Sequence, residues 1–79
     1  MKVFRLYGTS ACHLCEQAHG MLAALLDTQA DTGFEPVDIV ESDALFERYG
    51  LLIPVLQHPD GRELNWPFDP QQLQVFLAS

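Results

Sequence analysis

Basic residues are scarce in this sequence. Lysine and arginine together number 4 against 11 aspartates and glutamates, so the formal net charge is −7 at pH 7. A nucleic-acid-binding protein needs a basic patch to neutralise phosphates, and attraction to anionic membranes also depends on lysine and arginine. The composition therefore argues against nucleic acid and membrane surfaces as partners.

Long hydrophobic runs are also missing. No segment approaches the roughly 20 apolar residues of a membrane-spanning helix. The first residues, Met1 and Lys2, lead into a short strand-like run containing Arg5, without the apolar region of a signal peptide. We therefore expect a cytoplasmic location. The 79 residues suffice for a single small domain, 1–79, which we expect to be monomeric.

Cysteine is limited to Cys12 and Cys15. A bridge between residues three apart closes too small a loop to stabilise a fold much, and cytoplasmic cysteine pairs are more often catalytic or metal-binding. The pair stands where a strand-like run ends and helical periodicity begins, so both sulfurs can meet in one turn. Free N–H groups at a helix start favour a thiolate of low pKa. This placement indicates a dithiol/disulfide redox site.

The first half of the chain has the pattern of a strand, a helix and a second strand. The mostly apolar run 3–7 predicts a strand buried on both faces. Helical spacing of apolar residues predicts a helix from His13 to about Leu26, with Cys15 facing inward and Cys12 at the exposed tip. A second strand is predicted over 34–40, at a sheet edge because it contains a proline.

The second half predicts a helix, a hairpin and a last helix. A short helix is expected from Asp43 to about Tyr49, followed by a β-hairpin whose strands, 51–58 and 62–65, flank a turn. Asp69, followed by Pro70, marks the start of the last helix. The resulting order is βαβαββα, in which the first two strands are parallel and the hairpin is antiparallel.

This arrangement resembles the small glutaredoxin-like branch of the thioredoxin superfamily. The resemblance depends on Cys12-His13-Leu14-Cys15 after the first strand, Ile53-Pro54 before the hairpin, and the Asp69 cap. It implies an α/β thioredoxin-like fold, with a four-stranded mixed sheet and helices on both faces. It also implies thiol–disulfide electron transfer, in which Cys12 is the nucleophilic thiolate and Cys15 resolves the mixed disulfide.

The resemblance further implies where a substrate binds. Pro54 matches a proline that is cis in the family and lies beside the cysteines, where the backbone of Ile53 can pair with an extended substrate. The sequence itself does not establish a cis bond, because only about 5–6% of X–Pro bonds are cis in folded proteins. Trp66 is a candidate for an apolar substrate-facing wall, whereas we expect Phe68 in the core.

Departures from the glutaredoxin pattern concern glutathione. Typical members have a basic residue shortly before the first cysteine, where this chain has Thr9-Ser10-Ala11. They also have a Gly-Gly pair and two acidic residues before the last helix, where this chain has Asn65-Trp66-Pro67-Phe68-Asp69. We therefore expect weak binding of glutathione. Dithiol chemistry itself needs no cofactor inside the protein, so we expect no bound cofactor and an external thiol reductant. The expected partners are disulfide-containing proteins or small-molecule thiols.

The histidines leave alternatives open. A protonated His13 would stabilise the Cys12 thiolate, but its position equally suits a solvent-facing residue. His19 and His58 are expected at the surface. Cys12, Cys15 and His19 supply three possible zinc ligands, whereas a structural zinc site takes four, so we expect no metal site.

Two rival functions remain at this point. One is a non-catalytic binding module that docks proteins along the Ile53-Pro54 edge and the region of Trp66 and Phe68. The other is a small metal-binding protein that uses Cys12 and Cys15.

Overall fold

The computed structural model describes residues 1–79 and confirms the predicted element order. The elements are β1 (Lys2–Gly8), α1 (His13–Leu26), β2 (Thr32–Asp38), η1 (Ile39–Glu41), α2 (Asp43–Tyr49), β3 (Val55–Gln57), β4 (Glu63–Asn65) and α3 (Pro70–Ala78). The 3₁₀-helix η1 is the one element that the sequence pattern did not predict.

The strands form one mixed sheet in the order β2-β1-β3-β4. β1 and β2 are parallel, with pairs from Lys2↔Thr32 to Gly8↔Asp38, and the β1–β3 and β3–β4 pairs are antiparallel. β2 lies at an edge, as predicted from Pro36, because proline has no N–H to donate to a second neighbouring strand. The carboxyl end of the central strand β1 leads directly into the cysteine segment.

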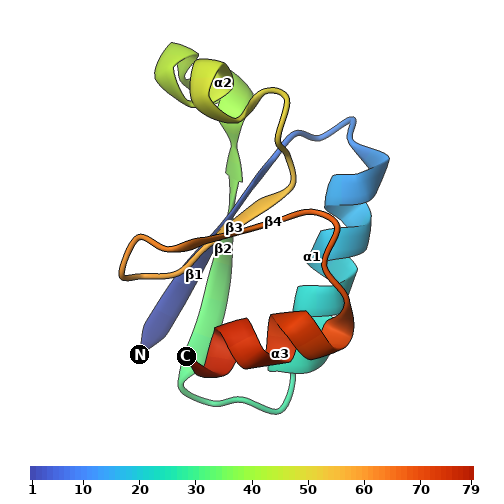
Figure 1. The fold of residues 1–79 in the computed structure, drawn as a ribbon, viewed down its shortest axis with the longest axis vertical. Helices are drawn as coiled ribbons and strands as arrows, with labels where there is room; N and C mark the ends of the chain where they lie inside the picture. Colours follow the sequence, from blue (N-terminus) through green and yellow to red (C-terminus); the bar gives the residue numbers. More distant parts are fainter.

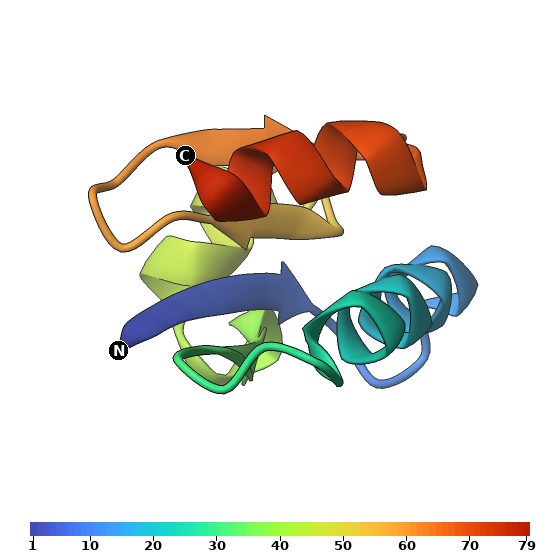
Figure 2. The same ribbon diagram turned by 90° about the horizontal axis from the view of Figure 1, so that it is seen from below.

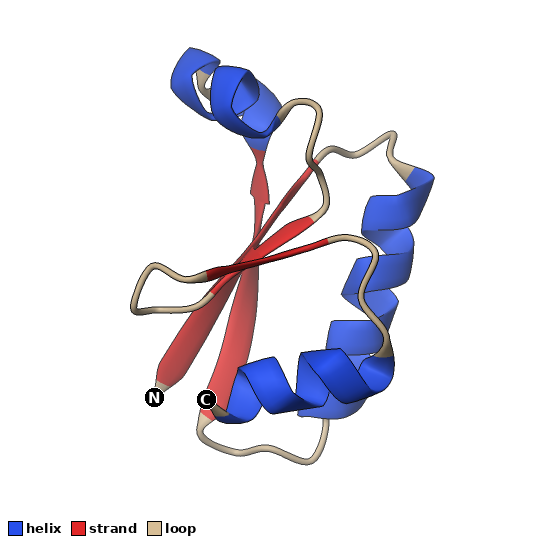
Figure 3. Ribbon diagram, viewed as in Figure 1, coloured by secondary structure: helices blue, strands red, loops and turns tan.

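Helices cover both faces of this sheet (Figures 1 and 3). α1 and α3 pack on one face over a core of buried side chains, namely Phe4, Leu6, Ala18, Leu22, Leu56, Phe68, Leu73 and Leu77. α2 packs on the other face over a smaller core of Tyr7, Ile39, Tyr49 and Val55. α2 lies at the opposite end of the molecule from α3, and it is the more distant, fainter helix in Figure 2. No helix is long and apolar enough to cross a membrane.

The first strand is buried on both faces only in its second half. Leu6, Tyr7 and Gly8 are buried, whereas Val3 and Arg5 are exposed. The reason is that the core under α2 reaches β1 only at Tyr7. The prediction that this strand is buried on both faces is therefore wrong for its first half.

The second strand begins and ends two residues earlier than predicted. It spans Thr32–Asp38, where the sequence pattern indicated 34–40. The side chain of Asp38 accepts a hydrogen bond from the N–H of Val40 at 3.0 Å and caps η1, so the chain leaves the extended conformation there. The helical turn that follows buries Ile39 under α2.

The hairpin strands are shorter than predicted. Leu52 and Ile53 donate their N–H groups to the carbonyl oxygen of Tyr49, at 2.8 and 3.1 Å, which turns the chain at the end of α2. Leu51 is fully exposed, and β3 starts only after Pro54. The apolar run that predicted a strand from residue 51 therefore begins with a turn, and the strand follows it.

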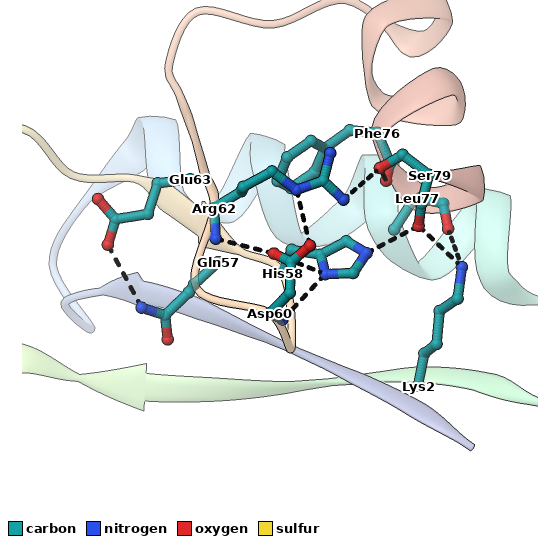
Figure 4. Close-up of polar contacts among 9 residues, drawn as sticks. All are labelled: Lys2, Gln57, His58, Asp60, Arg62, Glu63, Phe76, Leu77 and Ser79. Carbon is teal, nitrogen blue, oxygen red and sulfur yellow. Dashed lines mark hydrogen bonds and ion pairs between the residues drawn. The ribbon is translucent and has the colours of Figure 1, made fainter.

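His58 is buried, and the prediction of a surface position for it is wrong. Its Nδ1 lies 3.0 Å from the main-chain nitrogen of Asp60 and 3.1 Å from a carboxylate oxygen of the same residue, and its Nε2 lies 2.8 Å from the main-chain oxygen of Ser79 (Figure 4). The rings of Phe4 and Phe76 meet the imidazole edge-on, at 5.0 and 5.8 Å between centroids. Burial follows from the folding of the hairpin against the end of α3.

Two cations stabilise the same end of α3. Lys2 Nζ donates to the main-chain oxygens of Leu77 and Ser79, at 3.3 and 3.1 Å, and Arg62 donates to the Ser79 hydroxyl at 3.1 Å (Figure 4). The last turn of α3 has no basic residue of its own. Lys2 of β1 therefore satisfies carbonyls that a helix end leaves free, and Arg62 of the hairpin adds a second cation beside them.

Candidate active site

Cys12 and Cys15 are joined as a disulfide at the start of α1. Cys12 is the N-cap residue, with extended backbone angles, and Cys15 lies in the first helical turn. Their Cα atoms are 5.1 Å apart, within the usual range for a bridge. The two sulfurs therefore meet within one turn, as predicted from their spacing.

One backbone donor at the helix start points toward the Cys12 sulfur. The N–H of Cys15 donates to Cys12 Sγ at 3.2 Å, in the position that a serine or aspartate oxygen takes in an ordinary N-cap. When the pair is reduced, the same donor and the positive end of the helix dipole favour negative charge on this sulfur. This geometry suits Cys12 to be a thiolate.

The two cysteines differ in exposure. Cys15 is 7% exposed and faces the sheet with Ala18 and Leu22, whereas Cys12 is half-buried and reachable from solvent. The inward direction of Cys15 follows from its place on the buried face of α1. An incoming disulfide can thus approach Cys12 more readily than Cys15.

His13 is largely exposed and contacts residues of its own helix. Its Nδ1 lies 3.9 Å from a carboxylate oxygen of Glu16, and its Nε2 lies 3.2 Å from the side-chain amide of Gln17. It stands beside Cys12 in the chain, but its polar contacts are with Glu16 and Gln17. A role for His13 in tuning the Cys12 thiol stays a prediction.

The sheet brings Ile53, Pro54 and Trp66 to the end where the cysteines lie. Tyr7 pairs with Val55, so continuing this register places Pro54 across from Gly8 at the carboxyl end of β1. The N–H of Trp66 donates to the carbonyl of Pro54 at 3.3 Å, which continues the β3–β4 pairing by one residue. The Ile53–Pro54 and Trp66–Pro67 peptide bonds are both cis in the structure.

Trp66 and Phe68 have different surroundings. Phe68 is 4% exposed and belongs to the larger core, as the sequence predicted. Trp66 is half-buried and meets the Phe68 ring edge-on at 5.0 Å between centroids. The buried Phe68 ring therefore packs against one part of Trp66, and the rest of the Trp66 side chain stays exposed to solvent.

A cavity of about 540 Å³ opens beside Cys15 on the β2 side of α1. Its wall includes the carboxylates of Glu16, Glu35, Asp38 and Glu41. His19 is the only imidazole in the wall, and no lysine or arginine lines it. The space next to the buried sulfur is therefore strongly acidic.

Sequence reasoning missed the acidic residues of this cavity. They come from three elements, α1, β2 and η1, and they share no motif in the chain. A signal was present, because the carboxyl ends of two parallel strands lie at the same edge of a sheet. Applied to β1 and β2, this rule places Asp38 next to the segment that follows Gly8.

The structure contains no group of three or more histidine, cysteine, aspartate or glutamate side chains arranged to hold a metal ion. His19 lines the acidic cavity and packs edge-on against Phe34, with centroids 5.0 Å apart. The three-ligand set considered from the sequence is therefore not assembled in this state.

Comparison with known proteins gives a consistent result. The family model described as glutaredoxin-like domain (DUF836) matches residues 4–78. The X-ray and solution structures of target protein XcR50 from X. campestris are 44% and 42% identical to the chain, with TM-scores of 0.79 and 0.78. They cover 95% and 99% of this chain, which in turn covers 95% and 94% of theirs.

A more distant structure has the same fold. The solution structure of protein Ne2328 from Nitrosomonas europaea is 26% identical to the chain and has a TM-score of 0.78. The match covers 96% of this chain and 91% of Ne2328. No curated protein matches the chain significantly. With its family model matched over nearly the full length, and with a cysteine pair bridged at the start of α1, the chain belongs to the glutaredoxin-like domain family.

Proposed function

We propose that the protein is a thiol–disulfide oxidoreductase that uses Cys12 and Cys15 as a dithiol. The observation that carries this proposal is the arrangement of the bridged pair at the start of α1. Cys12 is the more exposed cysteine and its sulfur accepts a backbone N–H, while Cys15 is buried behind it. This arrangement distinguishes an attacking sulfur from a resolving one.

The proposed reaction transfers two electrons to a substrate disulfide. The Cys12 thiolate attacks one substrate sulfur, the substrate S–S bond breaks, and the departing thiolate takes a proton. The Cys15 thiol then loses its proton and attacks Cys12 Sγ. The second substrate thiolate leaves and is protonated, and the Cys12–Cys15 bond forms. An external thiol or dithiol reductant must reopen that bond, and no cofactor is held for this step.

Substrate binding is proposed along Ile53, Pro54 and Trp66. The N–H of Ile53 is already donated to Tyr49 at 3.1 Å, whereas its carbonyl accepts no hydrogen bond within the protein. An extended substrate would therefore gain a backbone bond to the Ile53 carbonyl, and Trp66 would supply apolar contact at its side. Both groups lie at the sheet end from which α1 and its cysteines continue.

The acidic cavity argues for a reductant other than glutathione. Glutathione has a net negative charge, and the cavity beside Cys15 presents four carboxylates and no lysine or arginine. The segment Thr9-Ser10-Ala11 adds no basic side chain before Cys12. Like charge at the site lowers the local concentration of such a ligand. We therefore propose protein disulfides or uncharged and cationic small thiols as partners.

A cytoplasmic location and a monomeric state remain part of this proposal. The cytoplasm supplies the reductants that reset such a pair, and the net charge of −7 opposes self-association and contact with nucleic acid or anionic membranes.

The proposal is tested with the variants Cys12→Ser and Cys15→Ser in a disulfide-reduction assay. The assay is run once with glutathione and its reductase and once with a thioredoxin-reductase system. We expect wild type to turn over with the second system, Cys12→Ser to be inactive, and Cys15→Ser to accumulate a mixed disulfide on Cys12. Alkylation with iodoacetamide at neutral pH provides a second reading.

Cys12 in the Cys15→Ser variant should alkylate faster than Cys15 in the Cys12→Ser variant, because its thiolate is both better stabilised and more exposed. Equal alkylation rates would make the assignment of roles wrong. Turnover that survives in Cys12→Ser would contradict the proposed chemistry itself.

A further inference from the structure

Gly8, the last residue of β1, lies directly against the buried sulfur. A Cβ atom at this position would be 2.9 Å from Cys15 Sγ and 3.1 Å from Cys15 Cβ. In proteins, a Cβ atom essentially never comes within 3.0 Å of a heavy atom that belongs to a residue elsewhere in the chain. The space that a side chain would occupy is therefore filled by Cys15.

Backbone conformation does not explain a glycine at position 8. Gly61 is the one glycine with a positive φ, at 100°, and Gly8 lies within the regular pairing of β1 with β2. Any residue can adopt such an extended conformation. The absence of a side chain at Gly8 leaves space for Cys15 Sγ, which is a redox-active sulfur under the proposed function.

We infer that Gly8 is a positioning residue for the redox pair, which favours the disulfide over the dithiol by leaving space for Cys15 Sγ against the end of β1. This inference rests on the proposed function. It concerns a residue that touches Cys15 without taking part in the chemistry, and it assigns to Gly8 an effect on the reduction equilibrium.

The effect differs between the two redox states for a mechanical reason. In the disulfide, Cys15 Sγ is bonded to Cys12 Sγ and cannot rotate about its side-chain torsion. In the dithiol it is free to turn, and the cavity bordered by Gly8, Ser10 and Cys15 offers it space. A methyl group at position 8 would therefore destabilise the disulfide more than the dithiol.

Gly20 offers a matched control. It lies on the exposed side of α1, and a Cβ there would meet no atom within 4 Å. Gly20→Ala makes the same chemical change as Gly8→Ala, in the same protein, away from the sulfurs. It should leave the reduction equilibrium unchanged, while improving the helix propensity of α1.

The experiment equilibrates wild type, Gly8→Ala and Gly20→Ala with mixtures of reduced and oxidised dithiothreitol. Dithiothreitol gives up two electrons and two protons and closes to its cyclic disulfide, while Cys12–Cys15 opens to two thiols. Acid quenching, alkylation and mass measurement give the oxidised fraction. We expect Gly8→Ala to raise the equilibrium constant for reduction by about tenfold or more, which corresponds to about 30 mV, and Gly20→Ala to match wild type.

Unfolding measurements on both redox forms keep the inference testable if Gly8→Ala is unstable. A loss of stability that is larger in the oxidised form, or confined to it, supports the inference. Equal losses in both forms, unfolding of both forms, or an unchanged equilibrium constant overturn it, because Gly8 would then serve only general packing. If wild type forms no disulfide at any mixture, the proposed function fails instead, so the two failures are distinguishable.

Discussion

Tyr49 of α2 is a buried side chain with contacts to both β1 and β4. It is 2% exposed, its ring stacks on Tyr7 at 4.4 Å between centroids, and its hydroxyl donates to the carboxylate of Glu63. Burial, followed by this hydrogen bond to Glu63, raises the pKa of Tyr49 to about 12. One residue thus ties α2 to β4 through a bond that exists only while the hydroxyl keeps its proton.

We expect Tyr49→Phe to lower the free energy of unfolding by about 1.5–3 kcal/mol at pH 7, the range for a hydrogen bond to a charged group. The raised pKa means that the folded state keeps the proton to higher pH than the unfolded state. The contribution of Tyr49 is therefore complete below about pH 10 and is lost as pH rises toward 12. Urea unfolding of wild type and variant between pH 7 and 11 measures both effects.

Tyr7→Phe is the control for this prediction. In wild type the Tyr7 hydroxyl donates at 3.0 Å to the neutral amide oxygen of Gln57. The expected loss in the free energy of unfolding is therefore only about 0.5–1.5 kcal/mol. If Tyr49→Phe shows the same alkaline decline as wild type, the Tyr49 hydroxyl is not responsible for it.

At the scale of elements, the candidate site is the shared end of the strands. Continuing the strand pairings places Asp38, Gly8, Pro54 and Trp66 side by side across β2, β1, β3 and β4. α1 begins a few residues beyond Gly8, so its first turn and the cysteines lie at this end. The candidate substrate groups thus come from the β3–β4 side, and the acidic cavity lies on the β2 side.

We expect Pro54→Ala to reduce turnover of a protein disulfide by about tenfold while the variant stays folded. Pro54 is buried across from Gly8 and shapes the backbone that precedes β3, so its loss should displace the Ile53 carbonyl. A displaced docking group of this kind can cost a reaction one to two powers of ten. Turnover and circular dichroism are measured together.

Pro59→Ala is the matched control for Pro54→Ala, because Pro59 lies in the exposed turn of the hairpin, far along β3 from the cysteines. Its turnover should equal that of wild type. Unchanged turnover in a folded Pro54→Ala variant would remove Pro54 from the proposed substrate-binding edge.

For the whole molecule, the dominant property is negative charge. The chain carries a formal charge of −7, and four of its carboxylates surround the cavity beside Cys15. Fields of this kind raise the local concentration of oppositely charged reactants and lower that of like-charged ones, most strongly at low ionic strength. Substrate charge should therefore affect the rate with which the pair exchanges disulfides.

We expect the reduced protein to react fastest with cystamine, which is cationic, more slowly with neutral hydroxyethyl disulfide, and slowest with anionic glutathione disulfide. The first and last rates should differ by about tenfold or more at low salt and converge as salt is added. Stopped-flow measurement of Cys12–Cys15 formation provides the rates.

The double variant Glu35→Gln/Glu41→Gln removes two cavity carboxylates and should narrow this spread. Glu47→Gln removes a charge from the exposed side of α2, outside the cavity, and should leave the spread nearly as in wild type. A spread that is the same for all three proteins would locate the charge preference elsewhere on the surface.

Features that depend on residues close in the chain were predictable without coordinates. Helix α1 begins and ends at the predicted residues, and Cys15 faces inward, because its burial follows from helical periodicity. The cap of α3 forms as predicted: Asp69 accepts the N–H of Gln72 at 2.7 Å, and Gln72 accepts the N–H of Asp69 at 3.0 Å. Periodicity and capping act within one or two turns, so a short stretch of sequence contains the whole of their cause.

Features that depend on strand pairing appeared only with the tertiary structure. The parallel register of β1 and β2 brings Asp38 and Glu35 to the cavity beside Cys15, and the β1–β3 register places Pro54 across from Gly8. The fold of the hairpin onto α3 buries His58, which local composition had suggested was exposed. Register and helix docking are set by the global fit of the core, and no local pattern shows which glycine a buried sulfur will press against.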